Sequence, residues 1–467
     1  MRHKSREKIT TYTLMNKNTP VLEFEYALAS STITAITALI NPAYAPLDAS
    51  RAYSDGVITE ESLNEWWRKR GIPSSRQHLA NAEDVLPASM MELLEHNYGL
   101  SLSDQYWLND SRSPKRWAEV NFFTNPFSVD IGRALFGGVS SEEALSNDFS
   151  LISPDVTTGG VLQKKWIIDE GQRVLVKGAE GQDRQQVFNE VIATELYSRL
   201  LPPDEYVTYK LIKEGHKVYC ACGDMIDIDE ELVSAKAIRL HFAREEKTSD
   251  YEHLVNSYEK LGVSHAVTAT AFSKMLVCDA LMANEDRHTG NFGVIRDVNS
   301  LEIKRIAPLW DTGNSLFFDN ASLLLTPGYE WEFRSKPFAA RMKTQLEYVD
   351  DYSWYDPKSL KGFRDYVAEK LSEIALYKSS GLDVAIAASV DCRRDYIDKQ
   401  AREWQLNHSR NHMYNEAQIA KPSDGKNQVQ PNLGPHHMED LVAQTTRVSE
   451  AREETRGGHG GHEEPKR

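Results

Sequence analysis

Residues 264–283 form a run that is apolar on nearly every face of a helix. Such a helix is stable only when other elements cover it on all sides, so the chain must build a substantial domain around it. The polar residues 284–290 follow directly, and we expect them to be a loop held by this rigid core, a position from which loops often carry function. Residues 291–295 and 303–308 have the pattern of two short strands joined by a turn.

Three polar side chains in and after this loop form an ordered set. Asp286 and Asn291 are five positions apart, and Asp311 follows the second predicted strand, which would deliver it close to Asp286. Phosphoryl transfer from a nucleotide uses one carboxylate to orient or deprotonate the attacking hydroxyl. It also uses a carboxamide and a second carboxylate to hold magnesium ions against the phosphates. The alternative is that Asp286 and Asn291 form turns and Asp311 caps one; the ordered set favours phosphoryl transfer.

The two motifs that contain these residues resemble the catalytic and metal-binding motifs of the HipA-like serine/threonine kinases. They read NEDRHTGN at 284–291 and APLWD at 307–311. These bacterial proteins have a kinase fold that is also related to the phosphoinositide kinases, and some are toxins of toxin–antitoxin pairs. The resemblance covers residues 150–400. It implies an α+β, bilobal, protein-kinase-like fold with a small β-rich lobe and a larger, mainly helical lobe.

This resemblance also implies roles for the residues of the loop. Asp286 is the catalytic carboxylate, and Asn291 and Asp311 are magnesium ligands, with ATP and Mg²⁺ as the cofactors. His288 is expected to support the loop. Arg287 has two open interpretations: it neutralises nearby carboxylates or a substrate phosphate, or it has a plain surface role.

A lysine and a helical glutamate are expected to hold the phosphates from the smaller lobe. Lys177 ends the short strand predicted at 173–177, where its ammonium group could reach into the cleft and pair with phosphate oxygens. The helix predicted over 184–200 offers Glu190 as the partner that holds Lys177 in place, with Glu195 as the alternative. The HipA-like family has such a pair, so the resemblance implies catalytic roles for Lys177 and Glu190.

A glycine-containing turn precedes the first strand of this lobe. Thr158, Gly159 and Gly160 stand there, and glycines let backbone N–H groups approach phosphates closely. The phosphate loop of the family ends in Gln and Lys, and the residues here that resemble it are Gln163, Lys164 and Lys165. We expect Lys165 to contact the nucleotide. Because the family modifies its own loop, the hydroxyls of Ser153, Thr157 and Thr158 are candidate autophosphorylation sites.

A strand predicted over 217–224 leads to the hinge of a kinase architecture, whose backbone amide and carbonyl read the edge of the adenine. The hinge candidates are residues 222–225, and we expect Cys222 and Asp224 to contact the nucleotide. Residues 230–235 are predicted to be helical.

Composition divides the chain into four parts. We expect an N-terminal accessory module at 1–145, the small lobe at 146–226 and the large helical lobe at 227–405. The remaining residues 406–467 are polar and end in a low-complexity run, which predicts a disordered tail.

The N-terminal module allows several interpretations. We expect a frayed arm at 1–18 and a short helix at 30–40. The aromatic residues of 59–135 are interpreted as ordinary core in preference to a partner surface. The basic cluster at 68–70 fits a helix-turn-helix or, equally, the solvated face of a charged helix.

Composition limits the classes of partner. The formal net charge of -15 argues against broad nucleic-acid binding and against direct DNA binding. Four irregularly spaced cysteines indicate neither a disulfide framework nor a zinc site, and favour a reduced, cytoplasmic setting. No run of 18 apolar residues is present, so no membrane helix is expected.

Together these features predict an ATP- and magnesium-dependent protein kinase that phosphorylates a serine or threonine hydroxyl of a protein substrate. Autophosphorylation, a role as the toxin of a toxin–antitoxin system and an antitoxin partner are further expectations from the resemblance. The alternatives are a pseudokinase or regulatory protein that binds DNA or an antitoxin, and a kinase that acts on a lipid or small-molecule hydroxyl.

Overall fold

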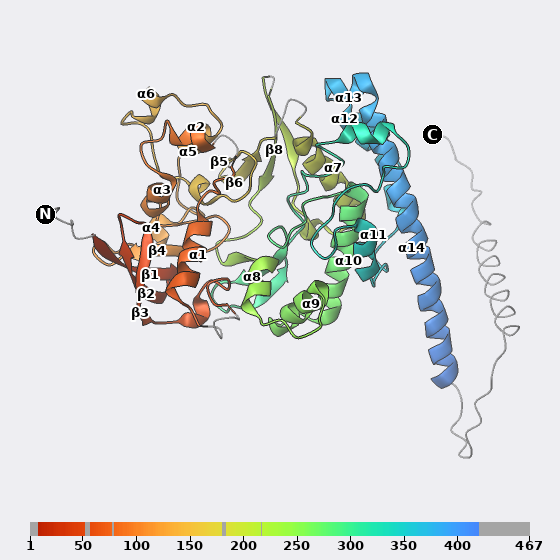
Figure 1. Cartoon of the computed structure of the whole chain (residues 1–467), viewed down its shortest axis with the longest axis horizontal. Helices are drawn as coiled ribbons and strands as arrows, with labels where there is room; N and C mark the ends of the chain where they lie inside the picture. Colours follow the sequence, from red (N-terminus) through yellow and green to blue (C-terminus); the bar gives the residue numbers. More distant parts are fainter. Residues whose placement is uncertain (1–7, 52–56, 77–78, 180–183, 216, 420–467) are drawn as a thin grey trace, which may run out of the picture. The chain divides into compact units, whose positions relative to one another are not determined.

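The computed structural model describes residues 8–51, 57–76, 79–179, 184–215 and 217–419 (Figure 1). The chain divides into two units, residues 1–407 and 408–467. The first is described below, together with the helix that continues past its end. The division of this unit into a module and two lobes at residues 145 and 226 stays a prediction.

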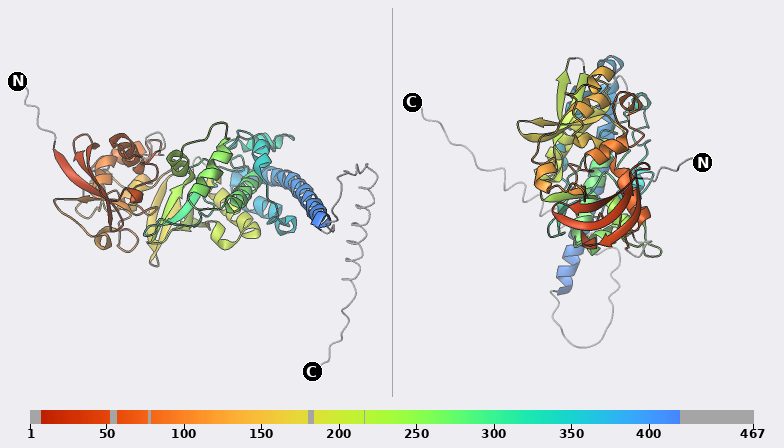
Figure 2. Two further views of the ribbon diagram at one scale, coloured as in Figure 1. Left: turned by 90° about the horizontal axis from the view of Figure 1, so that it is seen from below. Right: turned by 90° about the vertical axis from the view of Figure 1, so that its left-hand side faces the viewer.

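The chain begins with an antiparallel sheet whose strands β1, β2 and β3 curve together (Figure 2). The expected frayed arm is wrong for the residues that form β1, since Thr10 and Leu14 are buried against the rest of the sheet. The helix expected at 30–40 is also wrong, because this stretch is rich in β-branched residues, of which Thr32, Ile33 and Ile36 pair with β2 in a strand. The order is β3-β2-β1-β4, with β1 (Ile9–Asn16), β2 (Thr19–Ala27), β3 (Thr32–Leu39) and β4 (Tyr106–Asp110).

Short helices pack on this sheet and continue to residue 144. The first, α1, begins with a capping box in which Thr59 and Ser62 exchange side-chain to backbone hydrogen bonds. Its last residue, Arg70, is buried and forms a bidentate pair with Asp104, at 2.6 and 2.8 Å, so the basic cluster at 68–70 is not a free cationic patch. The helices are α1 (Glu60–Arg70), α2 (Leu79–Glu83), α3 (Met90–His96), α4 (Trp117–Val120), α5 (Asp130–Leu135) and α6 (Ser141–Ala144).

The aromatic side chains of this region are core. The interpretation as ordinary core is confirmed for six of them, which are all buried: Trp66, Trp67, Tyr106, Trp107, Trp117 and Phe122. Trp107, Trp117 and Phe122 pack with Trp166 of the next sheet, so this cluster joins the N-terminal region to the strands that follow.

The second sheet has the order β5-β6-β8-β7 and is covered by α7. Its first two strands form a hairpin through Glu170 and Gly171, both with positive φ, and the third runs antiparallel to β6. Its elements are β5 (Lys164–Asp169), β6 (Gln172–Lys177), α7 (Gln185–Leu200), β7 (Lys210–Glu214) and β8 (Lys217–Gly223).

The third sheet contains a strand where a helix was expected. Of residues 230–235, expected to be helical, 230–234 instead form β9, and only Ala235 is helical, as the first residue of α8. This strand pairs with β10 and places Glu231 opposite Arg296. Both side chains are buried and joined by a 2.6 Å hydrogen bond, a contact between residues 65 positions apart that local sequence does not reveal. The order is β11-β10-β9, with β9 (Glu230–Ser234), β10 (Gly293–Asp297) and β11 (Ile303–Ile306), so the hairpin predicted after residue 290 is confirmed.

Helices form the rest of the unit around α10. This is the apolar helix predicted at 264–283, and its residues from Met275 to Met282 are all buried. The last helix, α14, continues past residue 405, where we expected the ordered part to end; residues 420–467 of the predicted tail lie outside the described residues. The helices are α8 (Ala235–His241), α9 (Asp250–Lys260), α10 (His265–Met282), α11 (Met342–Gln345), α12 (Phe363–Leu371), α13 (Ala375–Ser380) and α14 (Leu382–Ile419). Short 3-10 helices include η1 (Pro42–Tyr44), η3 (Pro154–Thr157), η4 (Pro203–Glu205), η5 (Ala321–Leu325), η6 (Leu346–Tyr348) and η7 (Pro357–Leu360).

Two further properties concern the state of the cysteines and the hydrophobicity of the helices. All four cysteines are free thiols; three are buried and Cys392 is exposed. Across the described ranges, none of the helices combines the length and the hydrophobicity that crossing a bilayer requires.

Gly293 in β10 allows a test of the close pairing between β9 and β10, the strands next to the polar loop. A Cβ at Gly293 would collide with the carbonyl oxygen of Val233 and lie 2.9 Å from the Ser234 Cα, whereas a Cβ at Gly223 in β8 meets nothing within 4 Å. We expect Gly293→Ala to lower the free energy of unfolding by about 2 kcal/mol or more, because β9 and β10 must separate. Gly223→Ala, the matched control, should lie within about 0.5 kcal/mol of the wild type. Urea denaturation followed by circular dichroism measures both, and equal stabilities would contradict the close pairing.

Candidate active site

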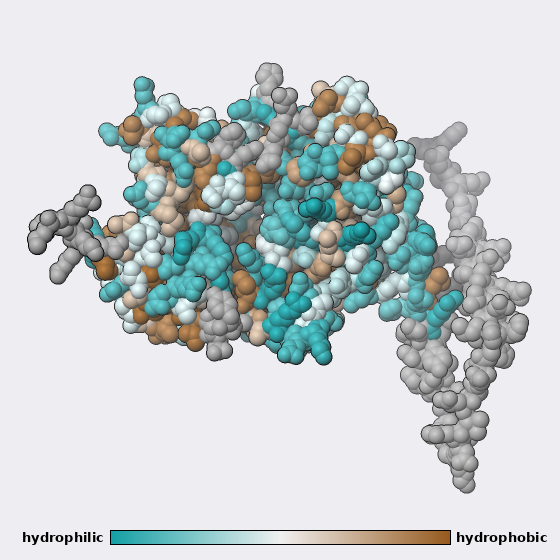
Figure 3. All heavy atoms as spheres, in the orientation of Figure 1, coloured by the Kyte–Doolittle hydropathy of each residue, from teal (hydrophilic) through white to brown (hydrophobic). Residues whose placement is uncertain are grey.

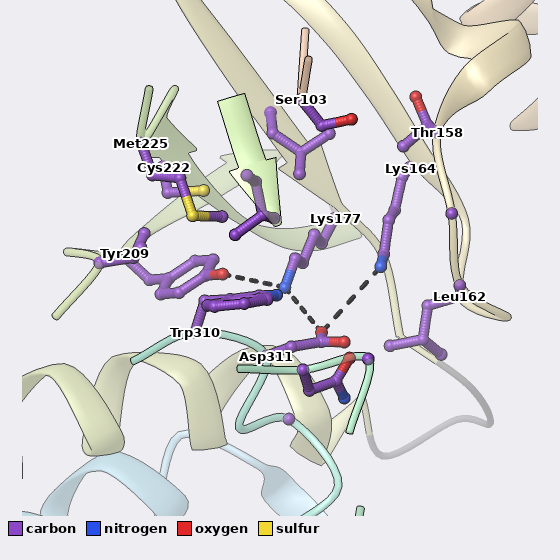
Figure 4. Close-up of a pocket in the computed structure, with 18 of the residues that line it drawn as sticks. Ser103, Thr158, Leu162, Lys164, Lys177, Tyr209, Cys222, Met225, Trp310 and Asp311 are labelled. Atoms are coloured by element: carbon purple, nitrogen blue, oxygen red, sulfur yellow. Dashed lines mark hydrogen bonds and ion pairs between the residues drawn. The ribbon is translucent and has the colours of Figure 1, made fainter. Parts of the chain in front are cut away.

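A cavity of about 640 Å³ lies where the second sheet, the polar loop and the N-terminal region meet (Figure 4). Its walls come from parts of the chain that are far apart in sequence. The residues that line it include Ser101–Ser103, Thr157–Leu162, Lys164, Lys177, Gln186, Tyr209, Cys222–Ile226, Asp286, His288, Asn291, Trp310, Asp311 and Asn314. The structure therefore brings together the predicted residues Thr158, Gly159, Gly160, Lys177, Cys222, Asp224, Asp286, Asn291 and Asp311.

Lys177 is the central cation of this cavity. Its Nζ donates to Asp311 Oδ1 at 2.8 Å and to the Tyr209 hydroxyl at 2.9 Å (Figure 4). It also donates to Glu190 Oε1 at 2.8 Å. Only 2% of Lys177 is exposed. Burial alone would lower the pKa of Lys177, but the carboxylates of Asp311 and Glu190 raise it well above its ordinary value. The alternative partner, Glu195, instead pairs with Arg199 at 2.8 Å.

Asp311 is a carboxylate held ionised by cations. Burial alone would raise its pKa, but Lys164 and Lys177 hold the pKa of Asp311 well below its usual range. Its backbone has φ +58°, in the left-handed region that a residue other than glycine adopts at a cost of about 1 kcal/mol or more. A main-chain hydrogen bond from Thr312 to Glu190 Oε2, at 2.9 Å, fixes the next residue and ties this turn to α7.

Lys164, not Lys165, is the second lysine in the cavity. The register of the β5–β6 hairpin pairs Lys164 with Lys177, so both side chains lie on the same face, and Lys164 Nζ is 4.0 Å from Asp311 Oδ1. Lys165 lies on the opposite face, with its Nζ 5.2 Å from the ring of Phe136. The expectation that Lys165 contacts the nucleotide is therefore wrong, because successive strand residues point to opposite faces.

An arginine of the N-terminal region fixes the glycine loop by hydrogen bonds to its backbone carbonyl groups. Arg76, with 3% of its surface exposed, donates Nη2 to the carbonyl oxygen of Thr158 and, at 3.0 Å, to that of Gly159. Sequence reasoning missed this contact, because 82 positions separate Arg76 from Thr158. The side-chain hydroxyl of Thr158 donates to the Pro154 carbonyl at 3.2 Å, and Ser153 is fully buried, so its hydroxyl faces no solvent in this state.

Arg287 fastens the polar loop to the core. It is fully buried, and its Nε lies 2.9 Å from Asp279 Oδ2 on α10, so of the two open interpretations the neutralisation of a nearby carboxylate is confirmed. Its Nη1 also donates to the carbonyl oxygens of Asn291, at 2.8 Å, and Trp310, at 2.6 Å. One guanidinium group thus fixes the backbone at Asn291 and immediately before Asp311. His288 Nδ1 accepts a 3.0 Å hydrogen bond from the Gly290 amide, which is a supporting role within the loop.

Asp286 has partners on both carboxylate oxygens. Its Oδ1 lies 2.7 Å from the Nζ of Lys336, and its Oδ2 accepts a 3.3 Å hydrogen bond from Asn314 Nδ2. Its carbonyl oxygen accepts from Asn291 Nδ2 at 3.1 Å, which directs the amide nitrogen away and leaves Asn291 Oδ1 as a potential ligand. Lys336 lies 50 positions from Asp286, and no local pattern identified it.

Asp224 is a half-buried residue at the predicted hinge. Its Oδ1 accepts a 3.3 Å hydrogen bond from the Ile226 amide, while its Oδ2 is buried without a partner among the described residues. Burial raises the pKa of Asp224 to about 7. Burial also raises the pKa of Cys222 to about 11, so that side chain is a neutral thiol at neutral pH.

The oxygen atoms of the cavity fit magnesium together with a phosphorylated ligand. Asn291 and Asp311 offer a carboxamide and a carboxylate oxygen, the hard donors that magnesium prefers. In the described part of the chain, no three His, Cys, Asp or Glu side chains gather as a metal site of their own. Phosphate and water oxygens would therefore complete the shell, as is usual for magnesium bound with a nucleotide.

Known proteins with a similar sequence or fold include the bacterial kinase CtkA. No protein-family model matches the chain. The serine/threonine-protein kinase CtkA of Helicobacter pylori strain J99 is 31% identical over 137 residues, which is 28% of this chain and 40% of CtkA, so the chain spans well under half of the curated relative it matches. The crystal structure of the H. pylori proinflammatory kinase CtkA aligns with 49% of this chain and 94% of its own, at 19% identity and a TM-score of 0.36.

HipA shares the fold over a larger part of the chain. The structure of HipA from Shewanella oneidensis MR-1, solved with HipB and operator DNA, covers 82% of this chain and 97% of its own, with 13% identity and a TM-score of 0.50. The chain thus has an α+β, kinase-like fold that it shares with HipA. Over 137 residues its sequence is similar to that of the serine/threonine-protein kinase CtkA.

The buried carboxyl group of Asp224 makes stability depend on pH. Its pKa of about 7 in the folded state compares with about 3.9 in an unfolded chain. Between these values the folded state keeps a proton that the unfolded state has lost, so the contribution of Asp224 to stability declines as the pH rises from about 4 to 7. We expect Asp224→Asn to remove this decline, so that its melting temperature rises relative to the wild type between pH 5 and pH 8. Thermal denaturation measures this, with exposed Asp148→Asn as control; a pH-independent difference would contradict the buried neutral state.

Proposed function

We propose that this chain is a HipA-like kinase, a magnesium-dependent protein kinase that transfers the γ-phosphoryl group of ATP to a serine or threonine hydroxyl. The observation that carries the proposal is the position of Lys177, whose Nζ lies 2.8 Å from both Glu190 and Asp311 in the cavity that Asp286 and Asn291 also line. A buried lysine fixed by a helical glutamate beside a metal-binding carboxylate is the arrangement that phosphoryl transfer uses to place phosphates.

Each group has a distinct role in this proposal. Lys177 and Lys164 bind phosphate oxygens, and Arg76 fixes the glycine loop whose amides face the nucleotide. Asn291 and Asp311 hold magnesium, which neutralises charge on the phosphates when it is bound. Asp224 and its neighbours in the hinge contact the base end of the nucleotide.

Asp286 acts on the acceptor. Its carboxylate accepts the hydrogen bond of the substrate hydroxyl and orients that oxygen toward the γ-phosphorus. A new oxygen–phosphorus bond forms, the bond between the γ-phosphorus and the β,γ-bridging oxygen breaks, and ADP leaves with the electron pair. The hydroxyl proton passes to Asp286. The ion pair with Lys336 must loosen at this stage, because it occupies one oxygen of Asp286.

The proposal includes a cellular compartment and a binding partner. Free cysteines at all four positions support a reducing compartment such as the cytoplasm. The HipA whose fold this chain shares was solved with HipB and operator DNA, which supports an antitoxin-like partner and a toxin role here as part of the same proposal. The net charge of -15 favours contact with DNA through such a partner over direct binding.

Two acidic residues separate nucleotide binding from chemistry. We expect Asp286→Asn to keep the magnesium-dependent thermal stabilisation by ATP and to lose about 100-fold or more in phosphoryl transfer, because only the acceptor loses its partner. We expect Asp311→Asn to lose the magnesium-dependent part of that stabilisation. Differential scanning fluorimetry and transfer from labelled ATP to a mixed protein substrate measure the two effects. Wild-type turnover by Asp286→Asn would contradict the catalytic assignment.

Neighbouring lysines give a matched pair for the phosphate site. We expect Lys164→Ala to weaken ATP binding by about 10-fold, because a charge-assisted contact is lost. Lys165→Ala removes the same charge one position away on the opposite face and should change the Kd by less than about 2-fold. Isothermal titration calorimetry with ATP and Mg²⁺ measures both. A larger increase of the Kd in Lys165→Ala than in Lys164→Ala would show that Lys165, and not Lys164, contacts the nucleotide.

A further inference from the structure

A basic segment follows the short helix η5 and stands out on this acidic chain. Residues 331–345 contain four basic side chains and one acidic side chain, Glu332, for a net charge of +3, while the whole chain carries -15. All four basic residues are exposed: Arg334, Lys336, Arg341 and Lys343. Strongly hydrophilic side chains gather over the region of α11, the helix into which this segment runs (Figure 3).

The segment forms a hairpin that is held by hydrogen bonds. Arg334 and Arg341 face each other in an antiparallel bridge, and the Ser335 amide donates to the Ala340 carbonyl at 3.1 Å. At the tip, the side chain of Gln345 donates to the Lys336 carbonyl at 2.7 Å and accepts from the Phe338 amide at 3.0 Å.

An aromatic cluster anchors the hairpin to the core. The ring of Phe338 packs against Tyr251 on α9 and Phe272 on α10, with centroids 5.1 and 5.8 Å apart. The cationic side chains therefore project from a fixed backbone, which lowers the entropy cost of binding an anion.

The hairpin lies beside the acceptor carboxylate. Lys336 reaches from its tip to Asp286, with 2.7 Å between Nζ and Oδ1. Any chain segment that presents a hydroxyl to Asp286 must therefore pass within reach of the hairpin.

Two of the cations form no close ion pair. Like charges directly opposite each other on paired strands destabilise a hairpin, yet Arg334 faces Arg341. Within the described residues neither forms a close ion pair with a carboxylate, and Arg334 acts only at longer range on the carboxyl of Glu285. Lys343 lies over the ring of Trp331 at 5.0 Å. An anion bound between the two arginines would relieve their repulsion, whereas a surface that served only solubility would gain nothing from this pairing on a chain that is already strongly charged.

We propose that the hairpin of residues 334–343 binds the acceptor and selects protein segments with acidic residues next to the phosphorylated serine or threonine. This rests on the proposed kinase function. Arg334 and Arg341 bind acidic side chains of the substrate. A further acidic side chain competes with Asp286 for Lys336, which frees Asp286 Oδ1 to accept the hydrogen bond of the substrate hydroxyl. Substrate binding thus uncovers the carboxylate that orients the hydroxyl. A protein is the favoured occupant over a nucleic acid because the chain as a whole repels polyanions.

The test compares peptides that share one serine and differ only in flanking charge. We expect the wild type to have a kcat/KM about 10-fold or more higher for a peptide with flanking Asp and Glu than for one with flanking Lys and Arg, with the difference mainly in KM. The double variant Arg334→Glu/Arg341→Glu should abolish or reverse this preference. The wild-type preference should also shrink as the salt concentration rises from 50 to 500 mM, because the contacts are exposed.

A matched control and an independent readout keep the outcomes distinct. Lys115→Glu/Arg116→Glu makes the same change in net charge at exposed positions of the N-terminal region, and it should keep the wild-type preference. Phosphoryl transfer by the wild type to any peptide or to water tests the kinase function itself. Transfer without an acidic preference, or a preference unchanged in the hairpin variant, overturns the inference and leaves the kinase proposal standing. Loss of duplex DNA binding in that variant, with peptide selectivity unchanged, would also overturn it.

Discussion

The ammonium group of Lys177 is shared between the carboxylates of Glu190 and Asp311, and the arrangement of the cavity depends on that shared cation. The three groups come from β6, from α7 and from the turn after β11. Burying any one of them alone would cost several kcal/mol, since a desolvated charge is stable only beside an opposite charge. The ion pairs therefore fix the second sheet, α7 and the Asp311 turn to one another. The same geometry presents an ionised carboxylate and two lysines to a single cavity, which is the electrostatic layout that a nucleotide triphosphate with a divalent cation requires.

Two buried arginines fix the backbone segments that line the cavity. Arg287 binds Asp279 inside the protein and holds the carbonyl groups of Asn291 and Trp310, so both proposed metal-binding positions are fixed by one buried group. Arg76 holds the carbonyl groups of Thr158 and Gly159 from the side away from the cavity. In a trans peptide unit the C=O and the N–H of the following residue point in opposite directions, so a carbonyl held by Arg76 turns that N–H the other way. The N-terminal region thereby supports the glycine loop of the cavity, and its aromatic core continues into β5 through Trp166.

The charges around Asp286 divide the cavity into two functional ends. The phosphate end is rich in buried, paired charge, whereas the acceptor end opens to solvent beside a rigid hairpin of exposed cations. Asp286 lies between them, and its ion pair with Lys336 is exchanged for the substrate hydroxyl in the reaction proposed above. Buried pairs give a fixed geometry, and exposed pairs give a contact that a substrate can displace at a small cost.

The sequence by itself determined the parts of this protein that depend on local pattern. The apolar helix α10, the hairpin of β10 and β11, and the order of Asp286, Asn291 and Asp311 follow from periodicity and spacing. For Lys177 the sequence indicated a glutamate on α7, and only the structure decided between Glu190 and Glu195. The turn of Glu170 and Gly171 also sets the register that pairs Lys164 with Lys177, which places Lys164 and not Lys165 in the cavity. Tertiary structure alone decided the rest. The β9 strand is fixed by the buried contact of Glu231 with Arg296, and Arg76 and Lys336 reach the cavity from 82 and 50 positions away. Such contacts have no local signature, because their stabilisation arises only after distant segments have packed together and excluded water.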